Sequence, residues 1–208
     1  MKGFFYKNVI ELLRQYRWML AMVVLFLVVG LSQKNAAYWG VYAEMVFGSF
    51  AGTLVRSDEV SGWNQYVRLL PISGKTAVSS FYIVPYLMMG VTTALYTIAA
   101  LIIRAYSHGT YLIFPTVYLM IVLPFLITAI TIPITIWFGS VKAPVVQMIL
   151  VVLMVATAMF ALTNGADVIA RLMNMNVVVF AAVSFAAVGA AVAVSWFLSV
   201  RAWERKKV

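Results

Sequence analysis

Long apolar runs, separated by short polar segments, dominate the pattern along this chain. A helix that crosses a bilayer needs about 20 mostly apolar residues. The pattern therefore predicts an all-α, polytopic membrane protein with six transmembrane helices, forming one domain over residues 1–208. The predicted spans are 18–31, 36–55, 76–103, 112–138, 144–162 and 177–200.

The composition fits this interpretation. Hydrophobic residues make up 64% of the chain and charged residues only 10%, whereas a soluble domain carries about 25% charged residues. The net charge of +9 does not predict a nucleic-acid partner, because the basic residues lie between and beyond the apolar runs, where lipid headgroups and membrane topology explain them.

The positions of Lys and Arg predict the orientation. With six spans, 12 of the 15 basic residues fall on one side of the membrane, and only Lys34, Arg104 and Arg171 fall on the other. We therefore predict a multi-pass protein of the cell membrane with both termini in the cytoplasm.

The N-terminal segment, residues 1–17, is amphipathic. Apolar side chains recur at helical spacing on one side of it: Phe5, Val9, Leu12, Leu13 and Tyr16. Such a helix suits the membrane interface. A charged lead-in that only sets topology fits the pattern equally well.

The segment after the second predicted span, residues 57–71, predicts a short cytoplasmic helix. Ser57 can cap its start, with Asp58 and Glu59 in the first turn, and Pro71 ends it. One apolar stripe is expected along this helix: Val60, Trp63, Val67 and Leu70. The stripe suits either a lipid surface or a protein partner.

Within the second span, Glu44 is the residue that lipid does not explain. A carboxylate at this depth costs roughly 2.5–3.5 kcal/mol, so it belongs to a substrate pathway, a subunit interface or a satisfied structural site. A shifted span that places Glu44 nearer the membrane interface is the other interpretation. Close helix packing, within one chain or between two, is expected at small residues of the second and sixth spans: Gly48, Gly52, Ala182, Ala186 and Ala190.

Two further segments carry structural expectations. Pro115, Pro124 and Pro133 free backbone carbonyls in the fourth span, which neighbouring hydroxyls can satisfy. The outer loop 163–176 is partly apolar, and a short external helix before the sixth span fits it.

Enzymatic chemistry has no support in the sequence. The chain has no Cys and a single His, His108, so disulfides and a metal centre are not expected. No phosphate-binding glycine loop, nucleophile elbow or zinc-protease motif occurs. We expect no catalytic residue, metal or cofactor on this chain.

The chain resembles the permease subunits of ABC type-2 exporters over nearly its whole length. The resemblance rests on the six predicted spans and on Glu59, Trp63, Tyr66 and the stretch Leu70–Ser73. Where the family pattern has a basic residue shortly after this stretch, the present chain has Phe81. Within this family, the chain is similar to bacterial permeases that export amphipathic phenol-soluble modulin peptides.

The resemblance implies that residues 57–71 form a coupling helix that docks on a separate ABC ATPase, which would bind ATP and Mg. The residues implied in that docking are Glu59, Val60, Trp63, Tyr66, Val67, Arg68, Leu70 and Pro71. It also implies a dimer with a second permease copy or a paralogue, and export of an amphipathic or hydrophobic cargo such as peptides. An ATP-independent carrier and a membrane-embedded binding or scaffold protein are the alternatives.

Overall fold

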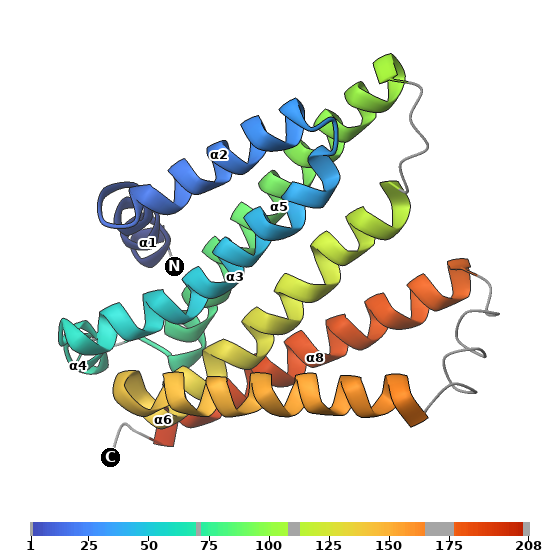
Figure 1. Cartoon of the computed structure of the whole chain (residues 1–208). Coiled ribbons are helices and arrows are strands. Elements are labelled where there is room, and N and C mark those ends of the chain that lie inside the picture. The colour runs from blue at the N-terminus through green and yellow to red at the C-terminus, as the bar shows by residue number, and fades with distance from the viewer. Residues whose placement is uncertain (1, 70–71, 108–112, 165–176, 206–208) are drawn as a thin grey trace.

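A computed structural model describes residues 2–69, 72–107, 113–164 and 177–205. The elements in these ranges are helices, as predicted (Figure 1). They are α1 (Lys2–Arg14), α2 (Arg17–Ser32), α3 (Ala36–Val60), α4 (Trp63–Leu69), α5 (Gly74–Ser107), α6 (Ile113–Asn164) and α8 (Val177–Arg205).

Three helices among the described residues are long and apolar enough to cross a membrane: Gly74–Tyr106, Pro115–Leu150 and Val179–Arg205. A fourth candidate arises if α1 and α2, which are bent by 66° relative to each other, are taken as one span. Length and composition therefore support several crossings, and the count of six stays a prediction.

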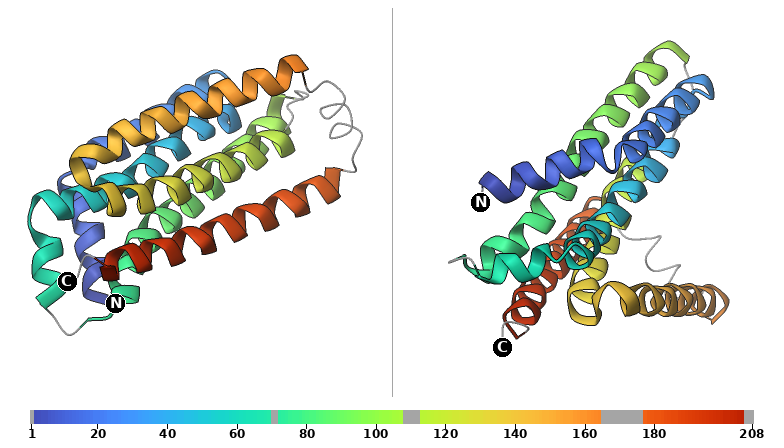
Figure 2. Two further views of the ribbon diagram at one scale, coloured as in Figure 1. Left: turned by 90° about the horizontal axis from the view of Figure 1, so that it is seen from below. Right: turned by 90° about the vertical axis from the view of Figure 1, so that its left-hand side faces the viewer.

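The central helix of the bundle is α3, which packs against α2, α5 and α6. Figures 1 and 2 show it between these neighbours. Its buried positions include Ala43, Glu44, Gly48 and Gly52. The buried Glu44 and the several glycines and tyrosines of α3 make it less apolar than the candidate spans.

Small residues let α3 and α6 approach closely. A Cβ on Gly52 would lie 2.3 Å from Cγ2 of Thr131, and one on Gly48 would lie 3.4 Å from the carbonyl oxygen of Pro124. The packing predicted at these two glycines is therefore found within the chain. The alanines of the other predicted packing surface, Ala182, Ala186 and Ala190, are exposed on α8.

A hydroxyl network joins α5, α6 and α8. Pro133 cannot donate to the carbonyl of Ala129 one turn earlier in α6, and the Ser195 hydroxyl of α8 donates to that carbonyl instead. The Tyr82 hydroxyl of α5 lies 2.7 Å from Ser195 Oγ and 2.8 Å from Ser199 Oγ. A hydroxyl does satisfy a carbonyl freed by proline, but it comes from α8 and not from a threonine of the same helix.

The long helix α6 consists of two helical arms, residues 113–138 and 140–164, that meet at Gly139. Gly139 has a φ of 79° and a ψ of 173°, outside the helical region. A single bend thus replaces the longer connection that the sequence predicted between the fourth and fifth spans. Figure 1 shows the two arms diverging from this bend.

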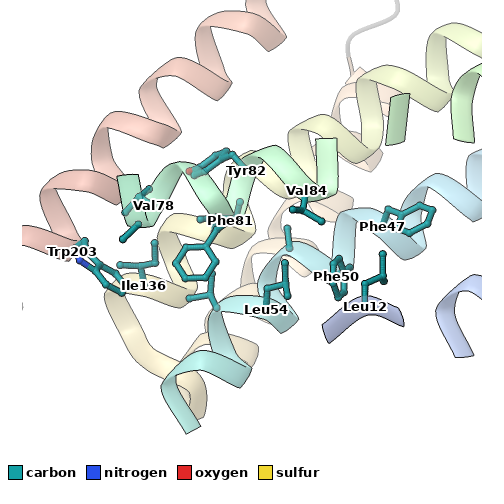
Figure 3. Close-up of a cluster of buried hydrophobic side chains, with 14 of the residues drawn as sticks. Leu12, Phe47, Phe50, Leu54, Val78, Phe81, Tyr82, Val84, Ile136 and Trp203 are labelled. Carbon is teal, nitrogen blue, oxygen red and sulfur yellow. The ribbon is translucent and has the colours of Figure 1, made fainter. Parts of the chain in front are cut away.

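One end of the bundle, which we call the N/C end, carries α1, α4, the Gly139 bend and the last turn of α8 (Figure 2). An apolar cluster fills it, to which α1, α3, α5, α6 and α8 all contribute (Figure 3). Leu12, Phe50 and Leu54 are fully buried there. The amphipathic α1 therefore packs partly on protein, while Tyr6, Ile10 and Leu13 form an exposed apolar face at helical spacing.

The close α3–α6 contact predicts a position-specific effect of a side chain. Gly52→Leu should destabilise the protein by about 1–3 kcal/mol, because the added atoms must displace Thr131. The matched control is Gly90→Leu, since a Cβ at Gly90 of α5 meets nothing within 4 Å. Unfolding of the purified variants in detergent measures the effect, and equal stabilities would contradict the packing described here.

Candidate functional site

The last two residues of α3 and the connection that follows to α5, residues 59–73, include α4, and we call this segment the connector. A break in the helix divides it. Gly62 has a φ of 74°, a left-handed conformation that glycine adopts readily, and its N–H donates to the carbonyl of Glu59 at 3.2 Å. This is a common way to end a helix.

The break corrects the predicted boundaries of the helix at residues 57–71. Ser57, Asp58 and Glu59 lie in the last turns of α3, so Ser57 does not cap a new helix. The new helix, α4, begins at Trp63 and ends at Leu69. Leu70 and Pro71 lie outside the described residues, and the Arg68 side chain is not described.

The apolar positions of this region face two directions instead of forming one stripe. Val60, Tyr66 and Leu69 are 75%, 53% and 84% exposed, whereas Val67 is only 3% exposed and belongs to the core. The prediction of a single stripe is wrong because Gly62 changes the direction of the chain between Val60 and Val67. We call Val60, Tyr66 and Leu69 the exposed connector surface.

Trp63 packs towards α1. Its ring centroid lies 6.4 Å from that of Phe4 and 5.5 Å from that of Tyr66, and Lys7 Nζ lies 5.7 Å from the centre of the ring. A cation over a Trp face is attracted by the ring electrons. Trp63 therefore anchors the connector on the N-terminal helix, a contact that spacing within the connector does not reveal.

Polar and charged contacts also attach α1 to the end of α3 and to α5. Lys7 forms an ion pair with the buried Asp58 at the end of α3, and Lys7 Nζ lies 2.9 Å from Glu11 Oε2. Asn8 Nδ2 donates to the carbonyl of Ser80 in α5 at 3.1 Å. A cavity of about 520 Å³ opens beside these contacts, and Arg14, Ser57 and Trp63 contribute to its lining.

Burial changes the titration of Asp58, which lies beyond the predicted span 36–55. Desolvation raises the pKa of its carboxyl from 3.8 to about 6, although the hydrogen bond and the charge of Lys7 favour the ionised form. At neutral pH the ionised Asp58 thus depends on Lys7 to offset its lost hydration.

Glu59 links the connector to the bend in α6. The backbone N–H of Ser140 donates to Glu59 Oε2 at 2.7 Å. The first N–H groups of a helix lack acceptors within it, and a carboxylate suits the positive end of the helix. Glu59 therefore fixes the start of the second α6 arm relative to the end of α3.

Phe81 joins α5 to α8 within the apolar cluster of the N/C end. It is buried, and its ring centroid lies 6.1 Å from that of Trp203 (Figure 3). A Cβ on Gly74, the first residue of α5, would lie 3.2 Å from Cδ1 of the same tryptophan. The aromatic residue that departs from the family pattern thus has a packing role in this chain.

Glu44 lies apart from the connector, between α3 and α5. It is fully buried, and Thr93 Oγ1 donates to its Oε1 at 2.7 Å. Its Oε2 has no hydrogen-bond partner among the described residues.

The predicted external helix before the sixth span lies outside the described residues. Within the described ranges, no group of three or more His, Asp or Glu side chains could hold a metal ion.

Comparison with known proteins identifies the chain's relatives. The model of the ABC-2 family transporter proteins matches residues 3–204, nearly the whole sequence. The chain belongs to the ABC-2 transporter family. No curated protein and no solved structure matches it.

Membership makes this ABC-2 protein a multi-pass permease component of an ABC transporter and not an enzyme. Proteins of the family generally work with an ABC ATPase, often as dimers. Contacts from α1, α3 and α6 meet at the connector, which makes it the candidate functional site of this permease.

The raised pKa of Asp58 predicts how stability depends on pH. Because the folded pKa exceeds the unfolded one, the contribution of Asp58 is complete below about pH 4 and is lost as the pH rises through about 6. The wild type should therefore lose about 2–3 kcal/mol relative to Asp58→Asn between pH 4 and 7. Unfolding free energies of both proteins measure this difference, and a constant difference would argue against the buried carboxyl.

The conformation of Gly139 predicts a second effect. Gly139→Ala should cost about 1–3 kcal/mol, because residues with a side chain avoid this φ/ψ region and the new Cβ would lie 2.8 Å from Glu59 Oε1. Gly3→Ala in α1 is the control, since its Cβ meets nothing within 4 Å. If thermal unfolding shows the two variants to be equally stable, the bend is not constrained as described.

Proposed function

We propose that this permease is the transmembrane subunit of an ATP-driven exporter that moves an amphipathic or hydrophobic cargo, such as an amphipathic peptide, out of the cell. The observation that carries the proposal is the two-sided connector. Its inner side is attached to α1 and α6, and Val60, Tyr66 and Leu69 remain exposed on its outer side.

The N/C end faces the cytoplasm in this proposal. The predicted distribution of Lys and Arg supports this orientation, and so does the location of the start of α1 and the end of α8 at the same end of the bundle (Figure 2). With α2, α3, α5, the two arms of α6 and α8 as the crossings, the six predicted spans and a cytoplasmic connector are compatible with the fold.

The exposed connector surface is the proposed docking site for the ATPase. An exposed tyrosine is a favourable anchor for a protein partner, and Val60 and Leu69 add apolar contact area beside it. Val67 does not take part, because it is buried in the permease core. Trp63 acts from behind the surface by holding the connector against α1, and ATP and Mg would bind to the partner subunit.

The attachments of the connector offer a route for coupling. A displacement of the connector on ATP binding would act on α1 through Trp63 and Lys7, and on the α6 bend through Glu59. Nucleotide can drive such a change only if the ATPase states differ in their affinity for the permease states. The diverging α6 arms are then the elements whose packing changes.

The cargo pathway and the second permease subunit rest on other surfaces. The exposed small residues of α8, Ala182, Ala186 and Ala190, would let a second copy or a paralogue approach closely. Glu44 is enclosed between α3 and α5 in this conformation. It would therefore contact cargo only in a state in which these helices separate.

The docking proposal predicts the effect of two truncations. Tyr66→Ala combined with Leu69→Ala should reduce co-purification of the ATPase at least tenfold, since hot-spot anchors often contribute about 2 kcal/mol or more. The permease itself should stay folded, because both side chains are exposed. Trp63→Ala should also weaken the complex, with a loss of permease stability as well.

Tyr106→Ala provides the control, because Tyr106 is more exposed than Tyr66 but lies near the far end of α5. Co-purification and ATP hydrolysis of the complex are the measurements. A double variant that still binds the ATPase and exports normally would refute the docking site. A permease that purifies alone and moves cargo down an ion gradient would instead support an ATP-independent carrier.

A further inference from the structure

A second cavity of the N/C end lies away from the connector. It has a volume of about 410 Å³ and is lined by Trp137 of α6 and by Leu198, Arg201, Ala202 and Arg205 of α8. Its size is within the range of about 300–1,000 Å³ that small-molecule sites occupy. The end of the first α6 arm and the last turns of α8 thus border an open cavity that lies outside the proposed docking surface.

The cavity is basic. Arg201 and Arg205 are four residues apart on α8 and therefore share one face of the helix. The ion pairs found among the described residues are those of Lys7, so neither arginine is paired with a carboxylate there. Glu204 does not line the cavity, and its Cγ would lie 3.2 Å from a Cβ on Gly74 of α5.

Paired guanidinium groups favour a phosphate ligand. Each guanidinium presents donors in a planar fork that matches the oxygens of a phosphate. Ser or Thr side chains that would select a sugar or a base are not among the described lining residues. A phosphodiester is therefore the chemical group that this cavity fits best.

The apolar wall points to a ligand with a hydrocarbon part. Trp137 and Leu198 line the same cavity, and both are exposed although they are large and apolar. Tryptophan and arginine together at the end of a membrane-crossing helix are typical of the headgroup level of a bilayer. A phosphate that binds here would thus carry acyl chains alongside Trp137 and Leu198.

The sequence after α8 strengthens the electrostatic argument. Lys206 and Lys207 follow Arg205, giving a cluster of basic residues directly after the last predicted span. Clusters of about 4–8 basic residues next to a transmembrane helix attract acidic lipids.

We propose that the cavity between Trp137 and the Arg201–Arg205 face of α8 binds the headgroup of an acidic phospholipid of the surrounding leaflet. The arginines hold the phosphate, and Trp137 and Leu198 contact the upper part of the acyl chains. The lipid would connect the end of the first α6 arm to α8, next to the bend that Glu59 stabilises.

Lipid titration of the delipidated full-length chain tests this proposal. Bound lipid is counted by native mass spectrometry with phosphatidylglycerol and with phosphatidylcholine of the same acyl chains. The wild type should bind one phosphatidylglycerol more tightly than the others and prefer it to phosphatidylcholine. Arg201→Gln combined with Arg205→Gln should weaken that binding about 30-fold or more, because each variant side chain loses charge-assisted hydrogen bonds to the phosphate.

Two further variants separate a site from general surface charge. Lys75→Gln with Lys142→Gln removes the same charge from exposed positions of the same end outside the cavity and should weaken binding by less than fivefold. Leu198→Trp, which fills the cavity without changing its charge, should abolish the tight binding. Equal losses in the two double variants would overturn the proposal.

Two other outcomes would also overturn it. Glycerol 3-phosphate that binds as tightly as phosphatidylglycerol would make this a site for a soluble phosphate. Loss of ATPase co-purification in the arginine double variant, with lipid binding unchanged, would make the cavity a protein-docking surface.

Discussion

Backbone polar groups that enter a bilayer must find their partners within the protein, because hydrocarbon offers none. The helical architecture follows from this constraint, and so do two contacts that α6 receives where its own hydrogen bonding is interrupted, at Pro133 and at Gly139. At Pro133 the freed carbonyl of Ala129 is satisfied by Ser195 of α8. At Gly139 the amide of the next residue is satisfied by Glu59 of α3. Both repairs come from other helices, so each local irregularity becomes a tertiary link.

The second of these links gives the connector its significance. Glu59 lies in the last turn of α3, directly before the break at Gly62, and its carboxylate fixes the start of the second α6 arm. Trp63 lies just after the break and packs with Phe4 and Lys7 of α1. A partner that moves the exposed side of the connector would therefore act on two membrane helices through short polar and aromatic contacts.

The sequence predicted the helical class, a short helix near Trp63 and the close packing at Gly48 and Gly52, because each depends on a local pattern. It did not predict which side of the connector Trp63 and Val67 occupy, since one glycine with a positive φ redirects the helix. The pairs Lys7–Asp58 and Glu59–Ser140 were also missed, as they join residues 51 and 81 positions apart. A signal for the bend was present in Gly139, which separates two apolar runs, but its conformation depends on the Glu59 carboxylate beside it.

Docking of an ATPase requires the connector to lie in the cytoplasm, where the ATPase can reach it. The chain contains no Cys, so single cysteines introduced at the exposed positions Leu69 and Lys34 can be labelled selectively. With a membrane-impermeant maleimide, Lys34→Cys should react in intact cells and Leu69→Cys only after the membrane is permeabilised. Labelling of Leu69→Cys in intact cells would contradict the proposed orientation and, with it, the coupling role of the connector.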